Sequence, residues 1–274
     1  MSALASAWTS ASVFVLGFFV LIWVVSVFKK DASIVDIFWG LGFVLLAWTA
    51  AWRPIADGVF GSGAFEPAPR QWLGLALVTI WGVRLAGYIG WRNRGHDEDY
   101  RYQAMRKRVG KAFVWRSLVT VFLLQGALVL LIGAPHVVLQ SADLPADHGW
   151  VWSDVLAVLL FAVGIYFEAV GDWQMARFKA DPANKGKVMD RGVWAYTRHP
   201  NYFGDAVCWW SFFVLALGVP GGLWTLPAPI LMTILLLKVS GVALLEKTIV
   251  ERRPEYADYI ARTNAFIPGP RRSA

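Results

Sequence analysis

The chain has 274 residues, of which 57% are hydrophobic and 16% are charged, and it carries a net charge of +7 with a single cysteine, Cys208. About a quarter of the residues in ordinary soluble domains are charged, so this composition argues against a soluble protein and favours a membrane protein. One cysteine also excludes an intrachain disulfide and a zinc site built from cysteines.

Seven apolar stretches are long enough, or nearly long enough, to cross a bilayer, which takes about 20 residues. They lie at 11–28, 34–52, 72–91, 113–134, 151–170, 206–219 and 227–245. No repeat, low-complexity tract or long soluble stretch interrupts residues 1–274, so we expect a single domain. The Gly- and Pro-rich segment 53–70 is expected to be a loop.

The basic residues predict the orientation of these spans. With the N-terminus outside, all Lys and Arg residues except Arg53, Arg70, Arg84 and Lys238 fall in inner loops or in the inner tail. Positive residues accumulate on the cytoplasmic side of membrane proteins. The sequence therefore predicts an all-α membrane protein with seven transmembrane helices, an outer N-terminus and a cytoplasmic C-terminus.

The positive charge on the inner side has two explanations. It could only fix the topology and contact anionic lipid, or it could bind a polyanion. Polar residues that the topology does not require are needed to decide between them.

Two ionisable residues lie in early spans. Asp36 opens the second span, and Arg84 lies in the third, on one helical stripe with Trp81, Tyr88 and Arg92. Charged residues inside a span are costly and are candidates for function. The alternative is an interhelical ion pair, such as one between Arg84 and Asp36 or Glu168.

Polar residues also gather around the start of the sixth span. Glu168 and Asp172 share one face at the inner end of the fifth span, and Asn201 and Asp205 share one face after Pro200, which suits a first helical turn. Capping of helix ends explains one or two such residues. A helix N-terminus flanked by Arg198 and His199 is also suited to phosphate.

The last segment is aromatic as well as charged. Glu246 ends the seventh span, and Tyr256 and Tyr259 follow before a terminal Phe-Ile-Pro. We expect this tail to fold back over the inner end of the helices.

Several classes of function lack their signature. The sequence has no Gly-x-Gly-x-x-Gly motif, no P-loop and no Gly-x-Ser-x-Gly motif, and its 4 histidines are scattered. We therefore expect no bound metal. No soluble basic domain is present that could bind nucleic acid.

The string "GVWAYTRHPNYFGD" before an apolar helix, followed by a Glu-led tail with spaced tyrosines and Phe-Ile-Pro, resembles the steroid 5-alpha-reductase and sterol reductase superfamily. With "VDIFWG", "RLAGYIGWRNRG" and "EDYRY", the whole chain resembles a bacterial branch of it. The resemblance implies a seven-helix membrane enzyme that holds NADPH in a cytosol-facing cavity. The enzyme would transfer hydride to an activated C=C bond of a steroid-like or other lipid.

The resemblance also implies the site residues. The cofactor would contact Arg84, Asn93, Arg94, Asp172, Arg177, Arg198, His199, Asn201, Tyr202, Asp205, Glu246 and Tyr259. Steroid 5-alpha-reductases grip the steroid ketone with an early Glu and a Tyr one turn before the residue that matches Arg84. Here Trp81 takes that Tyr position and Asp36 is the nearest acid, so Asp36, Trp81 and Tyr88 are the catalytic candidates.

Two alternatives to a reductase remain open. Arg-His-Pro-x-Tyr-x-Gly also occurs in isoprenylcysteine carboxyl methyltransferases, which use S-adenosylmethionine, and a transporter or scaffold is the third possibility. The bacterial resemblance implies a multi-pass protein of the plasma membrane whose cofactor site faces the cytoplasm. The expected partners are the bilayer and an apolar lipid substrate, without an obligate protein partner.

Overall fold

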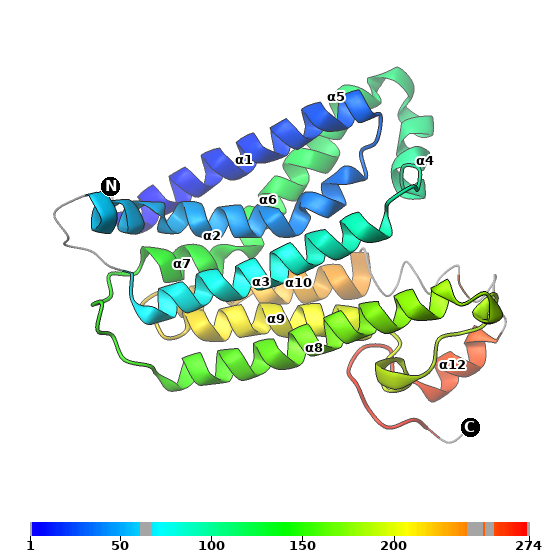
Figure 1. The fold of residues 1–274 in the computed structure, drawn as a ribbon. Coiled ribbons are helices and arrows are strands. Elements are labelled where there is room, and N and C mark those ends of the chain that lie inside the picture. The colour runs from blue at the N-terminus through cyan, green and yellow to red at the C-terminus, as the bar shows by residue number, and fades with distance from the viewer. Residues whose placement is uncertain (1, 61–66, 240–248, 250–254, 273–274) are drawn as a thin grey trace. The chain divides into compact units, whose positions relative to one another are not determined.

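A computed structural model describes residues 2–60, 67–239, 249 and 255–272 of the chain (Figure 1). All regular elements in this part of the chain are helices, which confirms the all-α prediction. The chain divides into two compact units. Unit 1 comprises Met1–Trp152 and Leu215–Thr225, and unit 2 comprises Ser153–Val214 and Leu226–Ala274. A single domain over 1–274 stays a prediction.

Unit 1 starts with three long helices, α1 (Ala3–Lys29), α2 (Ile34–Phe60) and α3 (Pro69–Arg92). A shorter helix, α4 (Tyr100–Val109), and the 3-10 turn η1 (Gly110–Ala112) follow. The next elements are α5 (Phe113–Ser117), the π-helical η2 (Leu118–Leu123), α6 (Leu124–Ile132) and α7 (Ala134–Ser141). The 3-10 turn η5 (Gly222–Thr225) completes the unit.

Close helix packing in unit 1 depends on two glycines. A Cβ atom on Gly82 of α3 would stand 2.6 Å from the carbonyl oxygen of Gly40 in α2, so the two backbones touch. Small residues at such crossings allow the approach that apolar helices need in a membrane. Beside this crossing, the fully buried rings of Phe43 and Trp81 pack edge to face with centroids 5.7 Å apart.

Two buried polar residues tie the start of α3 to other parts of unit 1. Arg70 is 1% exposed and donates hydrogen bonds to the carbonyl oxygens of Leu215, at 3.2 Å, and Gly218. Gln140 of α7 donates to the carbonyl oxygen of Gln71 at 3.0 Å. Leu215 is in the last turn of α9 and Gly218 lies just after it, where carbonyl groups lack a partner four residues on in the helix.

Unit 2 is dominated by α8 (Trp152–Ala180) and α9 (Pro200–Ala216), the last two residues of which belong to unit 1. The 3-10 turns η3 (Pro182–Asn184) and η4 (Gly192–Ala195) lie in the connection between them. After α9 come α10 (Pro227–Ile234), the π-helical η6 (Leu235–Val239) and α12 (Tyr256–Arg262).

Five helices in the described part of the chain are long and apolar enough to cross a membrane: Ala3–Lys29, Ile34–Trp52, Pro69–Arg92, Tyr100–Ile132 and Trp152–Ala180. They contain most of the first five predicted spans. The sixth overlaps α9 at residues 206–216, and the 17 residues of α9 reach only about 25 Å, less than the ~30 Å of a hydrocarbon core. The seventh is described only as far as residue 239. The count of seven and the orientation stay predictions.

One predicted loop proved wrong in part. Residues 53–60 of the expected loop 53–70 continue α2. The Gly and Pro residues there suggested a break, but such local preferences are weak and the surrounding structure overrides them.

Candidate functional site

The candidate site lies on α8 and α9, which cross within unit 2 (Figure 1). A Cβ atom on Gly164 would stand 2.7 Å from the carbonyl oxygen of Gly204 and 2.6 Å from Sγ of Cys208, so the helix backbones are in contact. Neither glycine was named from the sequence as a site residue, although Gly204 lies in the string that carries the family resemblance. Their positions were a usable signal, because Gly164 precedes Glu168 by one turn and Gly204 adjoins Asp205.

This crossing brings the acidic face of α8 against the start of α9. Asn201 donates its Nδ2–H to Oδ1 of Asp172 at 3.3 Å. Gly204 lies against Glu168, since a Cβ atom at 204 would stand 2.5 Å from the Glu168 nitrogen. Glu168 and Asp172 are buried, with 2% and 6% of their surfaces exposed. Two faces that the sequence predicted separately, 168 with 172 and 201 with 205, therefore belong to one helix interface.

Aromatic and basic side chains flank this interface. The ring of His199 stacks on that of Tyr202, with centroids 5.6 Å apart and planes inclined by 7°. His199 is buried and Tyr202 is half-buried, so the pair extends from the interior toward the surface. Such a pair offers a flat surface at the N-terminal end of α9.

Arg198 and Tyr259 hold the C-terminal tail. The Arg198 guanidinium donates to the carbonyl oxygens of Ile260, at 3.2 Å, and Thr263, at 2.5 Å, at the end of α12. Tyr259 donates its hydroxyl to the carbonyl oxygen of Trp194 at 2.6 Å. Burial raises the pKa of Tyr259 far above its ordinary value, so it stays a neutral donor. These contacts give both residues a structural role, and their contact with a cofactor stays a prediction.

The tail makes further contacts with the segment before α9. Thr197 donates its hydroxyl to the carbonyl oxygen of Phe266 at 2.8 Å, and the Gly269 nitrogen donates to the carbonyl oxygen of Tyr196 at 3.0 Å. Phe266 packs edge to face on Phe203 of α9. The described tail thus folds back, as the sequence predicted, and it covers residues 194–203.

Exposed cations follow α8 directly. Arg177 lies 5.2 Å from the ring of Trp173, near the end of the helix. Four more cations are exposed: Lys179 in the last turn of α8, and Lys185, Lys187 and Arg191 in the connection to α9. The acidic interface and this cationic segment are therefore neighbours along α8.

In unit 1, the predicted stripe on α3 runs from the core to the surface. Trp81 is fully buried, Arg84 and Tyr88 are half-buried, and Arg92 is exposed with its guanidinium 5.9 Å from the Tyr88 ring. The periodicity of α3 thus placed these residues correctly. Their predicted roles toward cofactor and substrate stay predictions.

The predicted Asn-Arg-Gly segment forms the turn that ends α3. Asn93 is the residue after the last helical one, and its Oδ1 accepts a hydrogen bond from Nε of Arg92 at 3.2 Å. Gly95 has φ 74°, which favours glycine because other residues are strained there. Arg94, between them, is exposed.

Asp36 forms an ion pair, but its partner is on α4. Arg101 donates to Oδ2 of Asp36 at 2.7 Å, and the Tyr102 hydroxyl donates to Oδ1 at 2.8 Å. Both partners belong to the "EDYRY" string. Asp36 therefore anchors α4 to the start of α2 through an ion pair with Arg101, whereas the sequence had offered Arg84 as a possible partner.

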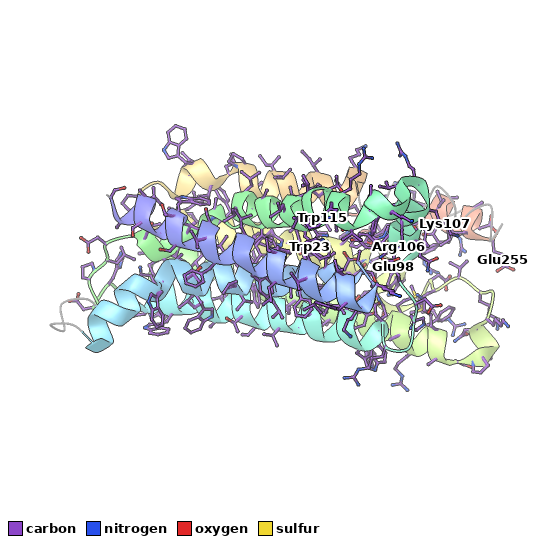
Figure 2. All side chains as sticks on the ribbon, turned by 90° about the horizontal axis from the view of Figure 1, so that it is seen from above. Trp23, Glu98, Arg106, Lys107, Trp115 and Glu255 are labelled. Carbon is purple, nitrogen blue, oxygen red and sulfur yellow. The ribbon has the colours of Figure 1, made fainter. Side chains whose placement is uncertain are left out.

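A second ion pair fixes the same connection. Glu98 accepts hydrogen bonds from Arg106, at 2.8 and 3.0 Å, and from the Ala32 nitrogen at 2.8 Å (Figure 2). Burial alone would raise the pKa of Glu98, but these hydrogen bonds lower it below its ordinary value. The pKa of Asp99, the N-cap of α4, is lowered in the same way, because hydrogen bonds from Arg101 outweigh burial.

Acid is expected to weaken this attachment. A carboxyl whose pKa is lower in the folded than in the unfolded protein stabilises the fold above its unfolded pKa, and the contribution is lost as the pH falls through the folded pKa. Glu98→Gln should therefore cost about 1 kcal/mol of unfolding free energy at pH 7 and almost nothing below about pH 3. Thermal unfolding of the wild type and of Glu98→Gln in detergent, from pH 3 to pH 7, measures this difference in stability. An equal difference at both ends of the range contradicts the assignment.

Two remaining predictions concern Glu246 and metals. Glu246 lies outside the described residues. Among the residues that the structure describes, no three His, Cys, Asp or Glu side chains gather closely enough to hold a metal ion. The candidate site on α8 and α9 therefore offers a cofactor hydrogen-bonding groups and nearby cations.

The model of the family described as protein of unknown function (DUF1295) matches residues 22–263, most of the chain. The chain belongs to this family. The DUF1295 match includes α2 to α10 and all of α12, so it covers the candidate site and the Asp36 network alike.

Two curated proteins resemble this DUF1295 chain. An uncharacterised protein of Schizosaccharomyces pombe is 24% identical over 276 residues, which covers 90% of this chain and 75% of the relative. A probable O-methyltransferase of Ustilaginoidea virens is 40% identical over 60 residues, only 22% of this chain and 21% of that protein. No solved structure matched the chain.

Proposed function

We propose that the chain is an integral membrane reductase that binds NADPH on α8 and α9 and reduces an activated C=C bond of a steroid-like or other lipid. The observation that carries the proposal is the hydrogen bond between buried Asp172 of α8 and half-buried Asn201 of α9, with a run of exposed cations that begins at Arg177 near the end of α8. The resemblance to steroid 5-alpha-reductases and sterol reductases supports it. We further propose that this side of the protein faces the cytoplasm of a bacterial cell.

The α8–α9 interface fits the uncharged half of the cofactor. A nicotinamide carboxamide both donates and accepts hydrogen bonds, and ribose hydroxyls donate to carboxylates. Asn201 offers a carboxamide and Asp172 a carboxylate, held together across the helix crossing at 3.3 Å. The stacked His199 and Tyr202 rings offer a flat surface for an aromatic ring.

The cationic segment fits the phosphates. NADPH carries two bridging phosphates and a third on the adenosine ribose, and such groups bind arginine and lysine side chains. Arg177, Lys179, Lys185, Lys187 and Arg191 are all exposed in this segment. S-adenosylmethionine has no phosphate, so it would leave these cations unused.

When bound, NADPH supplies the hydride. The residues of α8 and α9 would hold the nicotinamide end by hydrogen bonds and orient it, and orientation of the reacting groups is a large part of catalysis. Asp36, Trp81 and Tyr88 remain the candidates for the substrate side. For Asp36 the proton-donor role competes with its ion pair to Arg101.

Methyl transfer from S-adenosylmethionine is the second candidate. The match to a probable O-methyltransferase over 60 residues favours it. The carboxylates of Glu168, Asp172 and Asp205 are also suited to the positive ammonium and sulfonium groups of that cofactor. The two candidates thus share the α8–α9 interface and differ in whether the cationic segment takes part.

Titration of the purified protein with each cofactor separates the two. NADPH is expected to bind in the micromolar range, and Asn201→Ala or Asp172→Ala should weaken it at least about tenfold, because each removes a hydrogen bond at a buried site. Lys185→Gln/Lys187→Gln should weaken NADPH binding and lessen its dependence on salt. NADPH oxidation with enone lipids then tests the reaction.

Asn184→Ala is the matched control, because it removes a carboxamide from the connection between α8 and α9. Asn184 donates a hydrogen bond to the carbonyl oxygen of Phe178. The affinity of Asn184→Ala for NADPH should be unchanged. Binding of S-adenosylmethionine in place of NADPH would overturn the reductase proposal and leave methyl transfer.

A further inference from the structure

One end of unit 1 contains a corner where α1 packs against α5, and where the residue after α1 contacts α4. Trp23 donates its Nε1–H to the carbonyl oxygen of Val114 at 3.0 Å, and its ring centroid lies 5.4 Å from that of Trp115 (Figure 2). Arg106 donates to the carbonyl oxygen of Lys30 at 3.3 Å. These contacts place the basic stretches 29–30 and 106–111 next to each other.

The corner carries an excess of positive charge. Arg106 is balanced by Glu98 at 2.8 Å. The other cations of the two stretches are exposed and form no ion pair within the described residues: Lys29, Lys30, Lys107, Arg108 and Lys111. Each such cation contributes about 1 kcal/mol of attraction to an anionic bilayer surface.

Exposed apolar side chains lie beside these cations. Phe28, directly before Lys29, is 84% exposed, and Trp115 is 69% exposed. Phe14 and Leu21 are exposed at seven-residue intervals on the same face of α1 as Phe28. In a helix long enough to cross a bilayer, this face contacts lipid, and exposed Trp rings mark the level of the headgroups.

We infer that this corner binds the headgroup of an anionic phospholipid. Lys29, Lys30, Lys107 and Lys111 surround the headgroup phosphate, while Phe28 and Trp115 contact the adjoining acyl chains. A soluble anion would gain nothing from these two exposed rings, which is why the ligand is a lipid. The inference does not depend on the proposed cofactor site in unit 2.

The full-length protein, purified in a neutral detergent without NADPH, provides the test. Native mass spectrometry would measure binding of phosphatidylglycerol and phosphatidylcholine. Phosphatidylglycerol is expected to bind at least about tenfold more tightly. The variant Lys29→Gln/Lys30→Gln/Lys107→Gln/Lys111→Gln should bind both lipids alike. Inorganic phosphate at equal concentration should not compete.

The matched control is Arg177→Gln/Lys179→Gln/Lys185→Gln/Lys187→Gln, which removes the same number of cations from unit 2 and should keep the preference. Equal loss in both variants would mean that only net charge matters and would overturn the inference. No preference in the wild type, or competition by inorganic phosphate, would overturn it too. If the fourfold variant does not fold, two double variants replace it: Lys29→Gln/Lys30→Gln and Lys107→Gln/Lys111→Gln. Each should lose part of the preference for phosphatidylglycerol. An unchanged preference in both would overturn the inference.

Discussion

Gly204→Ala is expected to lower the free energy of unfolding by about 1–3 kcal/mol and to abolish measurable NADPH binding. The new Cβ atom would stand 2.5 Å from the Glu168 nitrogen and closer still to the carbonyl oxygen of Gly164. Both are backbone atoms, which cannot turn aside as a flexible side chain can. The helices must separate, and the Asp172–Asn201 pair separates with them.

Thermal unfolding in detergent and NADPH titration measure the two effects of Gly204→Ala. Gly17→Ala on α1 is the matched control, because a Cβ atom there meets no atom within 4 Å. Alanine in that exposed helix should leave stability unchanged or raise it slightly. If Gly204→Ala is as stable as Gly17→Ala, α8 and α9 do not touch as described.

Arg198→Ala is expected to release the C-terminal tail at a cost of about 2–3 kcal/mol, since it leaves carbonyl groups at the end of α12 without a donor. The same residue also fixes the tail through its backbone nitrogen, which donates to the carbonyl oxygen of Asn264 at 2.9 Å. Arg198→Lys should have an intermediate effect, because lysine keeps the charge but lacks the planar fork.

Hydrogen exchange of residues 255–272 and limited proteolysis measure release of the tail. Arg191→Ala, at an exposed position in the same segment, is the control and should leave the protection of 255–272 unchanged. Full protection of the tail in Arg198→Ala would contradict the anchoring role. NADPH binding that survives tail release would show that the tail supports the fold more than the site.

Much of the local structure followed from the sequence. Long apolar stretches must be helical in a bilayer, because every backbone polar group there needs an internal partner. Helical periodicity placed Trp81, Arg84 and Tyr88 along one stripe of α3, from core to surface. The spaced aromatics of the tail correctly indicated burial, since Tyr256 and Tyr259 are 7% and 2% exposed.

The sequence did not predict which residues far apart in the chain form hydrogen bonds and ion pairs with one another. For Asp36 the sequence offered Arg84 as one possible partner, and the structure shows an ion pair with Arg101, 65 positions away. The resemblance assigned Arg198 and Tyr259 to a cofactor site, and only the structure shows that both also bind main-chain carbonyl groups. A local pattern shows that a polar side chain needs a partner and leaves open which one.

The sequence by itself determined that this chain is an all-helical protein suited to a membrane, and on which faces of α8 and α9 the acids and the amide lie. Those properties depend on apolar length and on a period of 3.6 residues, both of which are local. Only the tertiary structure decided that Gly164 meets Gly204, that Asp172 therefore meets Asn201, and that the tail covers Trp194 to Phe203. Those contacts depend on how closely two backbones approach, a distance that no local pattern contains.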